Sequence, residues 1–495
     1  MLLKNLIAPL LFKKVIGSEE IEILGIHNDS RVMQQGFLFV CTKGEKLNGH
    51  QYIQQAVENG AVAVLIQEEQ EHYDPNITYI YVPDTGKAAS IIVDAFYQSP
   101  TSKLNLIGVT GTNGKTTTTN LIDHLLTHHK RATGVVGTIE IRYPGFREEA
   151  KLTTPLCYDL QASFKQMVDA GVEYAVMEVS SHALDLGRIH GCNFKTAVFT
   201  NLTQDHLDYH HTMEEYGEAK GLLFAQLGNH YENLKYAVLN ADDPWSEKYK
   251  RKTAAQIISY GIKAEAEVRA VDIQIDATGT SFTLITPMGQ TRIRTALIGR
   301  FNVYNLLAAI CAVLPEGLSL DEIQEACEQI HGVEGRFEAV VQGQPFAVVV
   351  DYAHTPDSLE NVLKTARQLQ PNQLICVVGC GGDRDRTKRP IMANKAIELA
   401  DFTYFTSDNP RTEDPVAILQ DVTGHLEDDG KHATVVNRQE AIEQAIASAK
   451  PNDIIIIAGK GHEKYQIIGT VKTYFDDKEV ARNKLMELGY TLQGK

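Results

Sequence analysis

One stretch decides the fold of this chain: Gly108-Val109-Thr110-Gly111-Thr112-Asn113-Gly114-Lys115-Thr116-Thr117. A mostly apolar run, Leu104 to Val109, precedes it, and a helix-like segment, Asn120 to Leu126, follows it. Strand, glycine-rich loop, Lys-Thr pair and helix in this order predict a phosphate-binding loop. Glycines let backbone N–H groups converge on phosphate oxygens, and the helix N-terminus adds positive potential. A chance glycine-rich turn is a poor alternative, because all four parts are present in sequence.

The loop predicts that the chain consumes a nucleoside triphosphate. We expect Lys115 to reach the terminal phosphates and the Thr116 hydroxyl to bind Mg²⁺. The first glycine of the common G-x-x-x-x-G-K-[ST] pattern would fall at Val109, so this loop is a variant form. The predicted ATP-binding residues of the loop are Gly111, Thr112, Asn113, Gly114, Lys115, Thr116 and Thr117.

Composition indicates a multidomain enzyme. The chain has 495 residues, of which 43% are hydrophobic, enough for about three domains of ~100–200 residues each. Its formal net charge of −16 argues against a nucleic-acid-binding protein, which would carry a basic face. No apolar run approaches the ~20 residues of a membrane span, so we expect a cytoplasmic protein that does not enter a membrane.

Cysteine usage supports the same compartment. The seven cysteines are scattered and form no C-x-x-C pair, so we expect reduced and mostly buried thiols. Cys376 and Cys380 lie four residues apart without a partner Cys or His at zinc spacing, and no zinc site is predicted.

Alternating strands and helices predict an α/β chain of three domains. We expect a small N-terminal α/β module over residues 1–100, a central P-loop-type ATPase domain over 101–331 and a C-terminal Rossmann-like domain over 332–495. The predicted strands of the first module are Phe37 to Val40 and Ala61 to Ile66, with a helix from Gln51 to Glu58 between them. Those of the second are Tyr174 to Val179 and Lys195 to Thr200; those of the third are Ala347 to Val350, Leu374 to Val378, Phe402 to Thr406 and Ile454 to Ile457.

Polar residues follow two central strands at their carboxyl ends, where such sheets bind ligands. Glu178 ends one strand, and Asp205-His206 follow the next. Hard oxygen ligands suit Mg²⁺, so Glu178 is a better candidate than His206. Lys220, in a helical stretch, has the pattern of an ordinary surface lysine.

Several collinear motifs resemble the Mur ligase family of ATP-dependent, amide-forming ligases of peptidoglycan precursor synthesis. Besides the loop, the motifs are Glu178-Val179-Ser180-Ser181-His182, Asp205-His206-Leu207-Asp208-Tyr209-His210, Gly299-Arg300-Phe301-Asn302-Val303-Tyr304-Asn305, Gly335-Arg336-Phe337-Glu338 and Asp351-Tyr352-Ala353-His354-Thr355-Pro356. The resemblance spans nearly the whole chain. It is greatest to the members that add the third residue of the stem peptide.

The resemblance implies roles for residues around the nucleotide. It implies that Lys220 is carbamylated, which would replace an ammonium that opposes Mg²⁺ by a carboxylate-like group. Asn302 and Asn305 would lie near the adenine, although a helix-cap role stays open for one of them. Asp351 would lie near the ribose and Arg336 near the γ-phosphate. The implied metal ligands are Thr116, Glu178, His206 and Lys220.

The same resemblance implies two organic substrates besides ATP. The first is the UDP-N-acetylmuramoyl dipeptide, held by Ser30 in Asp29-Ser30-Arg31 and by Thr153, Thr154, Ser181 and Arg188. An arginine fits an anionic substrate, although a surface loop arginine is the alternative for Arg188.

The second substrate is the incoming amino acid. Asp408-Asn409-Pro410-Arg411 resembles the motif of family members that add meso-diaminopimelate, and Arg411 can pair with its distal carboxylate. Taken alone, the tetrapeptide would be a proline-containing turn. Arg384 would bind the carboxylate at the reacting end, and Gly459 and Glu463 also match, with Glu463 binding the distal ammonium.

The implied reaction needs no protein nucleophile. ATP phosphorylates the D-glutamyl carboxylate, and the amine of the amino acid displaces phosphate, with Lys115 and Arg336 stabilising the transferring group. The general base is His354 or a substrate-bound water. Alternatives are a lysine-adding ligase, a folylpolyglutamate synthetase and a non-catalytic ATP-gated binding protein. We expect a monomer.

Overall fold

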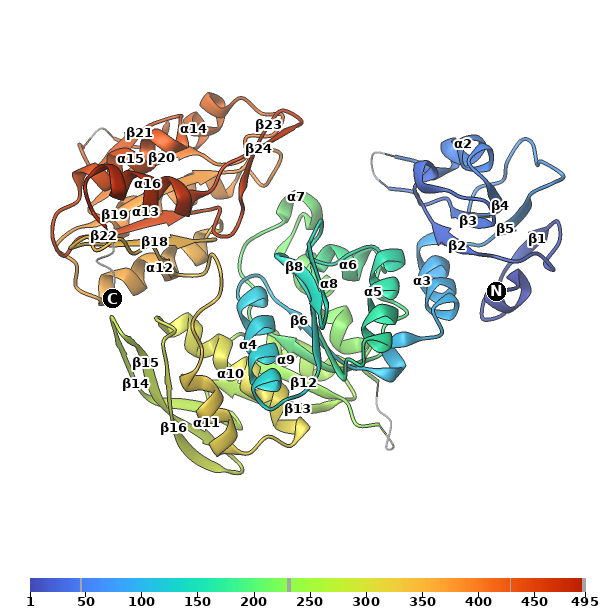
Figure 1. Ribbon diagram of the computed structural model, residues 1–495, viewed down its shortest axis with the longest axis horizontal. Coiled ribbons are helices and arrows are strands. Elements are labelled where there is room, and N and C mark those ends of the chain that lie inside the picture. Colours follow the sequence, from blue (N-terminus) through green and yellow to red (C-terminus); the bar gives the residue numbers. More distant parts are fainter. Residues whose placement is uncertain (45–46, 229–232, 428, 492–495) are drawn as a thin grey trace.

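The computed structural model describes residues 1–44, 47–228, 233–427 and 429–491. Three large sheets follow one another along the chain, each with helices packed on it (Figure 1). The N-terminal part lies at one end of the molecule, and the C-terminal part lies against the central part (Figure 1). This mixed α/β architecture of three domains confirms the predicted fold class, whereas the boundaries at residues 100 and 331 stay predictions.

The first sheet has five strands in the order β1-β5-β4-β3-β2. Its core is built by alternate apolar residues of β3 and β4 packed against α1 and α3 on one face and α2 on the other. The elements are α1 (Leu3–Leu6), β1 (Lys14–Ile16), β2 (Gly25–His27), η1 (Ser30–Val32), β3 (Phe37–Val40), η2 (Gly49–Tyr52), α2 (Ile53–Glu58), β4 (Ala61–Ile66), β5 (Thr78–Tyr81), α3 (Thr85–Phe96) and η3 (Pro100–Lys103).

The second sheet has eleven strands in the order β16-β15-β14-β13-β12-β11-β6-β10-β7-β8-β9. Parallel pairing runs from β7 through β10, β6, β11 and β12 to β14, and antiparallel hairpins extend both ends. Apolar residues of α4, α10 and α11 cover one face, and those of α5, α8 and α9 cover the other. Both faces are therefore buried, which explains the near-continuous apolar runs of the central strands.

The elements of this second part follow in chain order. They are β6 (Asn105–Thr110), α4 (Lys115–His128), β7 (Thr133–Val136), β8 (Glu140–Tyr143), β9 (Phe146–Glu149), α5 (Cys157–Asp169), β10 (Tyr174–Glu178), α6 (Ser181–Asp185), β11 (Phe194–Phe199), α7 (Leu207–His210), α8 (Met213–Ala225), β12 (Tyr236–Asn240), α9 (Trp245–Lys252), β13 (Gln256–Gly261), β14 (Val268–Asp276), β15 (Gly279–Thr286), β16 (Gly289–Thr295), α10 (Arg300–Val313), η4 (Leu314–Glu316) and α11 (Leu320–Glu328).

The third sheet has six strands in the order β17-β18-β22-β19-β20-β21, and all pairs except β17–β18 are parallel. Helices α12, α13 and α14 pack on one face, and α15 and α16 on the other. The elements are β17 (Glu338–Ala339), β18 (Ala347–Asp351), α12 (Pro356–Gln368), β19 (Leu374–Cys380), α13 (Lys388–Leu399), β20 (Phe402–Ser407), α14 (Pro415–Thr423), β21 (His432–Thr434), α15 (Arg438–Ser448), β22 (Ile454–Ala458), the hairpin β23 (Tyr465–Ile468) and β24 (Val471–Tyr474), and α16 (Asp477–Glu487).

The predicted strands are all present, within one or two residues of their expected ends. Two helices differ from expectation. Helix α4 begins at Lys115 rather than near Asn120, because Gly114 takes a left-handed conformation (φ 87°) that ends the loop at that point. The four threonines of its first turns are buried although polar, which hid the helix from a hydrophobicity pattern. The helix expected from Gln51 starts as the 3-10 turn η2, and α2 follows from Ile53.

No helix among the described residues is both long and apolar enough to span a lipid bilayer.

Candidate active site

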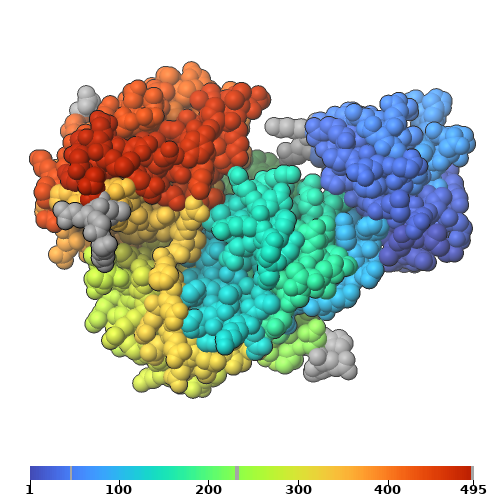
Figure 2. Space-filling view, in the orientation of Figure 1, coloured from blue at the N-terminus to red at the C-terminus, as the bar shows by residue number. Residues whose placement is uncertain are grey.

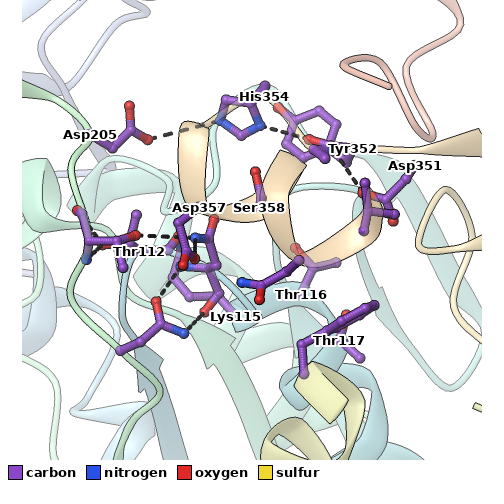
Figure 3. A pocket seen from close by; sticks show the side chains of 18 of the residues that line it. Thr112, Lys115, Thr116, Thr117, Asp205, Asp351, Tyr352, His354, Asp357 and Ser358 are labelled. Carbon is purple, nitrogen blue, oxygen red and sulfur yellow. Dashed lines mark hydrogen bonds and ion pairs between the residues drawn. The ribbon is translucent and has the colours of Figure 1, made fainter. Parts of the chain in front are cut away.

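A cavity of about 770 Å³ lies between the second and third parts of the chain. In the space-filling view these two parts adjoin over a broad front (Figure 2). The cavity is lined on one side by the phosphate loop and the carboxyl ends of β10 and β11, and on the other by the carboxyl ends of β18, β20 and β22. Figure 3 shows side chains from both parts directed toward the same space, with dashed contacts between them. Apart from Gly111, Asn302 and Pro410, the predicted ATP and amino-acid residues therefore share one cavity.

The phosphate loop connects β6 to α4. Lys115 donates hydrogen bonds from Nζ to the backbone oxygens of Gly111 and Thr112, each at 2.9 Å. Burial lowers the pKa of this ammonium, and the nearby Glu178 and Asp205 carboxylates act in the opposite direction. A Cβ at position 114 would collide with the Asn305 side chain, so only glycine fits this turn. The Lys115 side chain is thus folded back over the backbone of the loop.

Side-chain hydrogen bonds tie the loop to the third part of the chain. Arg336 donates from Nη2 to Thr116 Oγ1 at 2.9 Å, and its guanidinium lies 4.4 Å from the centre of the Tyr352 ring. Asn113 donates from Nδ2 to Asp357 Oδ2 at 2.8 Å. Arg336 therefore reaches the predicted position of the terminal phosphate although it is more than 200 residues from the loop.

Glu178 and Thr116 form the oxygen-rich side of the cavity. Glu178 accepts hydrogen bonds from Thr116 Oγ1 at 3.0 Å and from the backbone N and Oγ1 of Thr138 at 2.8 and 3.0 Å. Hydroxyl and carboxylate oxygens suit Mg²⁺, which usually keeps several waters and bridges substrate phosphates. Among the residues described, no group of three or more His, Cys, Asp or Glu side chains could hold a metal by itself. A magnesium ion here would therefore depend on ATP oxygens.

Lys220 is not a surface lysine, so the interpretation from sequence pattern alone is wrong. Its side chain is buried, with 1% exposure, and Nζ donates to Gly111 O at 2.9 Å and lies 4.4 Å from the Tyr216 ring centre. Burial, reinforced by the Lys115 charge, lowers the pKa of Lys220 well below its ordinary value. Helix α8 presents Lys220 to the phosphate loop because β11 pairs with β6 and the chain then returns through α7, so that α8 also contacts β6.

Asp205, one of the polar residues expected at the carboxyl ends of the central strands, is the centre of a charge cluster that the sequence did not predict. Lys388, at the start of α13, donates from Nζ to Asp205 Oδ1 at 3.3 Å. His206 Nε2 and His354 Nε2 lie 3.4 and 4.0 Å from Asp205 Oδ2. Burial alone would raise the pKa of Asp205, but Lys388 and the two histidines hold it well below its ordinary value. Asp205 is therefore a carboxylate at neutral pH.

The two histidines are uncharged at neutral pH. Enclosure lowers the pKa of His206 to about 3 and that of His354 to about 4, and in each case Asp205 opposes the shift. His354 Nδ1 is 2.8 Å from the Tyr352 carbonyl oxygen, which assigns the proton to Nδ1 and leaves Nε2 as an acceptor. His206 has a left-handed backbone (φ 55°) at the start of α7.

The predicted adenosine residues separate into two kinds. Asn305 lines the cavity, whereas Asn302 donates from Nδ2 to Ile298 O at 2.9 Å, a contact that closes the start of α10. The helix-cap alternative therefore suits Asn302. Asp351 lines the cavity at the end of β18 and accepts from the backbone N of Phe337 and of Ala353, at 2.6 and 2.8 Å.

The predicted amino-acid residues meet at the ends of β19, β20 and β22. Arg384, Asp408, Asn409, Arg411, Gly459 and Glu463 line the cavity, whereas Pro410 does not and only shapes the turn. Arg411 has a left-handed backbone (φ 53°) and donates from Nη1 to Gly382 O at 2.8 Å. Burial, reinforced by the charge of Arg384, lowers the pKa of Arg411. Two arginines thus share one wall, and among the described residues no carboxylate forms an ion pair with either guanidinium, as an anion-binding site requires.

The residues expected to hold the dipeptide do not all meet. Thr153 lines the cavity, and Thr154, Ser181 and Arg188 gather just behind it: Arg188 Nη1 donates to Thr154 O at 3.2 Å, and Ser181 Oγ contacts His210 Nε2 at 2.9 Å. Arg188 is half-buried rather than a surface loop residue. Ser30 belongs to the first sheet's domain, where its hydroxyl donates to Gln55 Oε1 at 2.7 Å, so it lies outside the cavity.

Comparison with known proteins accounts for this arrangement. Residues 22–97 match the model described as Mur ligase family, catalytic domain; residues 109–313 match the Mur ligase middle domain; and residues 335–461 match the Mur ligase glutamate ligase domain. UDP-N-acetylmuramoyl-L-alanyl-D-glutamate--2,6-diaminopimelate ligase of Bacillus cereus is 51% identical over 473 residues, which are 95% of this chain and 96% of the relative. The chain belongs to the Mur ligase family.

Solved structures of Mur ligases share the fold. A structure titled with the same diaminopimelate ligase name superposes with a TM-score of 0.66 at 34% identity, covering 95% of this chain and 96% of that one. A folylpolyglutamate synthase of Mycobacterium tuberculosis, solved with ADP and AMPPCP, has a TM-score of 0.60 at 19% identity and covers 74% of this chain and 91% of that one. The likeness to folylpolyglutamate synthase shows a shared fold and nothing more.

Sequence reasoning missed several cavity residues of this Mur ligase. Thr138, Asp357 and Lys388 contact Glu178, Asn113 and Asp205, respectively. Thr138 follows the end of β7, and Lys388 begins a helix after the glycine-rich end of β19, so the rule that ligands meet strand carboxyl ends could have found both.

Proposed function

We propose that this chain ligates meso-diaminopimelate to UDP-N-acetylmuramoyl-L-alanyl-D-glutamate with hydrolysis of ATP to ADP and phosphate. The observation that carries the proposal is the single cavity in which the phosphate loop lies opposite Arg384, Asn409, Arg411 and Glu463. An amide-forming ligase must bring a triphosphate and an amine together, whereas a binding protein has no need of this proximity.

In the first half-reaction the D-glutamyl γ-carboxylate attacks the γ-phosphorus of ATP, and the bond from that phosphorus to the ADP oxygen breaks. Lys115 on the loop and Arg336, which contacts Thr116 from the third part of the chain, would stabilise the charge on the transferring group. Asn305 and Asp351 hold the adenosine, and the loop residues Gly111 to Thr117 hold the phosphates. Catalysis in this step is positioning and electrostatics.

Thr116, Glu178, His206 and a carbamylated Lys220 would hold Mg²⁺ together with ATP oxygens. The ion would neutralise charge on the phosphates. A buried amine of lowered pKa is the nucleophile that carbamylation needs: it adds to the carbon of CO₂, an N–C bond forms, and one proton leaves. The product is an anion, which removes the repulsion between Lys220 and Lys115.

In the second half-reaction the amine attacks the acyl carbon, and phosphate leaves. His354 Nε2 is a free acceptor on the cavity wall, so His354 can take the amine proton; a substrate-bound water is the other base. Ser30, Thr153, Thr154, Ser181 and Arg188 would hold the UDP-muramoyl dipeptide. Arg384 would bind the carboxylate at the reacting end of the amino acid.

The preference for one amino acid over another would depend on the residues that bind its distal end, Arg411 and Glu463. Arg411 would pair with the distal carboxylate, and Glu463 with the distal ammonium. Lysine lacks that carboxylate, so it would leave Arg411 enclosed and unpaired, a cost of about 3 kcal/mol or ~100-fold in specificity.

The test is phosphate release by the purified protein with ATP, Mg²⁺ and the UDP-muramoyl dipeptide. Release should require all three organic substrates, with meso-diaminopimelate preferred over L-lysine by at least ~100-fold in kcat/KM. Preference for lysine would identify a lysine-adding ligase. Phosphate release that does not depend on the dipeptide would refute the proposal, and no phosphate release at all would favour a binding protein. We further propose that the enzyme acts as a monomer in the cytoplasm.

A further inference from the structure

Lys460 stands directly behind the wall that carries Asn409 and Glu463. It follows Gly459 at the end of β22, is fully buried at 0% exposure and does not line the cavity. Its Nζ donates to Asn409 Oδ1 at 2.9 Å and to the Tyr465 carbonyl oxygen at 2.7 Å, and Glu463 Oε2 lies at 3.4 Å. Asp408 Oδ1 is 3.3 Å from the same atom. An ammonium has three N–H groups, so these partners occupy all of them.

Lys460 determines which way the Asn409 amide faces. Asn409 Oδ1 accepts from Lys460 Nζ and also from the backbone N of Ile467 at 3.0 Å, so the amide oxygen points inward. Asn409 Nδ2 must then point the other way, and it donates to Glu463 Oε2 at 2.9 Å. A reversed amide would set two donors against the Lys460 ammonium and the Ile467 N–H. Lys460 thus fixes the position of the Glu463 carboxylate through the hydrogen bonds of Asn409.

Lys460 also supplies the counter-charge for two enclosed carboxylates. Enclosure raises the pKa of Glu463, the Asp408 charge raises it further, and Lys460 opposes both. The remaining groups that face Glu463 are the hydroxyl of Tyr352, 3.4 Å from Oε1, the Tyr465 ring, and the more distant Arg411 and Arg438. Removing Lys460 would leave Asp408 and Glu463 side by side, and Glu463 would take up a proton.

We infer that Lys460 is a positioning residue that sets the preference for the distal ammonium of the incoming amino acid, by orienting Asn409 and keeping Glu463 an acceptor. The inference rests on the proposed function. Lys460 touches no substrate, and its effect passes through Asn409 and Glu463. Arg411, which would bind the distal carboxylate, forms no hydrogen bond or ion pair with Lys460 in the described part of the chain, so recognition of the distal carboxylate and of the distal ammonium can be tested separately.

The test compares meso-diaminopimelate with 2-aminopimelate, which keeps the reacting amine and both carboxylates but lacks the second amino group. Wild-type enzyme should prefer diaminopimelate. Lys460→Gln, whose amide can still donate to Asn409 and Tyr465 without a charge, should raise the KM for diaminopimelate at least about tenfold while kcat falls much less. Its kcat/KM for 2-aminopimelate should change little, so the preference shrinks. Lys464→Gln, beside it but 55% exposed in its side chain, is the control.

The pH profile separates this role from a merely structural one. As pH rises from 7 to 9, the ratio of mutant to wild-type kcat/KM for diaminopimelate should increase, because Glu463 loses its extra proton; the ratio for 2-aminopimelate should stay flat. Lys460→Arg, which keeps the charge, should retain the preference and is the variant to use together with Lys460→Met if the glutamine variant does not fold. An equal loss of kcat/KM with diaminopimelate and 2-aminopimelate, or a raised KM for ATP, would overturn the inference. Failure of the wild type to use diaminopimelate would instead refute the proposed function.

Discussion

Lys388 and Asp205 form a buried ion pair across the boundary between the central and C-terminal parts of the chain. Their side chains are 7% and 8% exposed, and the Nζ–Oδ1 distance is 3.3 Å. Gln204 donates from Nε2 to Thr387 Oγ1 at 3.1 Å beside this pair. Because Asp205 also approaches His206 and His354, the pair joins the contact between the two parts to the groups around the phosphate loop.

Lys388→Met should weaken this closed arrangement. An enclosed Asp205 without its partner is costly, so we expect kcat/KM to fall at least about tenfold, which corresponds to 1.4 kcal/mol. Small-angle scattering should show a larger radius of gyration. Lys395→Met, on the same helix but paired with Glu360 within the C-terminal part, is the matched control and should keep both properties. An active, compact Lys388→Met variant would contradict a closing role.

Lys220→Ala should reduce ligation by at least about a hundredfold, since the variant loses the carbamate that would hold Mg²⁺, and losing such electrostatic stabilisation of the phosphates costs several kcal/mol. Short carboxylic acids such as formate should restore part of the activity by replacing the lost carboxylate. In wild-type protein supplied with ¹³C-labelled bicarbonate, NMR should show a carbamate signal that the variant lacks. Full activity of the variant would exclude the carbamate.

Lys115→Ala should abolish turnover while leaving binding of uridine nucleotides largely intact. The loop lies in the central part, whereas Ser30 lies in the first sheet's domain, where its hydroxyl contacts Gln55 and not the loop. Calorimetry with UDP-muramoyl dipeptide measures the binding. Loss of that binding in a variant that keeps its circular dichroism spectrum would show that the assignment of residues 1–100 is wrong.

Arg411→Ala should remove most of the preference for meso-diaminopimelate over L-lysine. The loss should come chiefly from weaker use of diaminopimelate, by roughly 3 kcal/mol. The measurement is kcat/KM for both amino acids. Arg386→Ala is the control, because Arg386 is exposed and pairs with Asp421 away from the cavity. An unchanged preference would assign carboxylate recognition elsewhere.

His462 should make stability depend on pH. Burial, together with the Arg336 charge, lowers the pKa of His462 to about 3, against about 6.5 in the unfolded chain. Between these two pH values the unfolded state binds one more proton than the folded state, so the free energy of unfolding falls as pH falls. At pH 5 this loss, relative to neutral pH, is up to about 2 kcal/mol. Urea unfolding at pH 7 and pH 5 should show a smaller pH effect in His462→Gln than in wild type.

His425→Gln is the control, because it removes an exposed histidine rather than a buried one. Equal pH effects in wild type and His462→Gln would mean that His462 does not carry this linkage.

Local sequence predicted the strands of the doubly wound sheets and the loop between β6 and α4. Apolar runs such as Ile454–Ala458 and glycines such as Gly114 act on their immediate neighbours, so each signal can be seen within about ten residues. The antiparallel strands β14 to β16, with alternating burial, were not predicted, because they extend the sheet only through pairing with β13.

By itself, the sequence determined the fold class, the phosphate loop and, through collinear motifs, the family. Tertiary structure decided that Lys220 is buried beside Gly111, that Asn302 closes its own helix while Asn305 faces the cavity, and that Lys388 meets Asp205. The physical reason is distance along the chain. A charged side chain on a helix looks the same whether it faces water or a neighbouring strand, and only packing between segments 100 to 200 residues apart settles its surroundings.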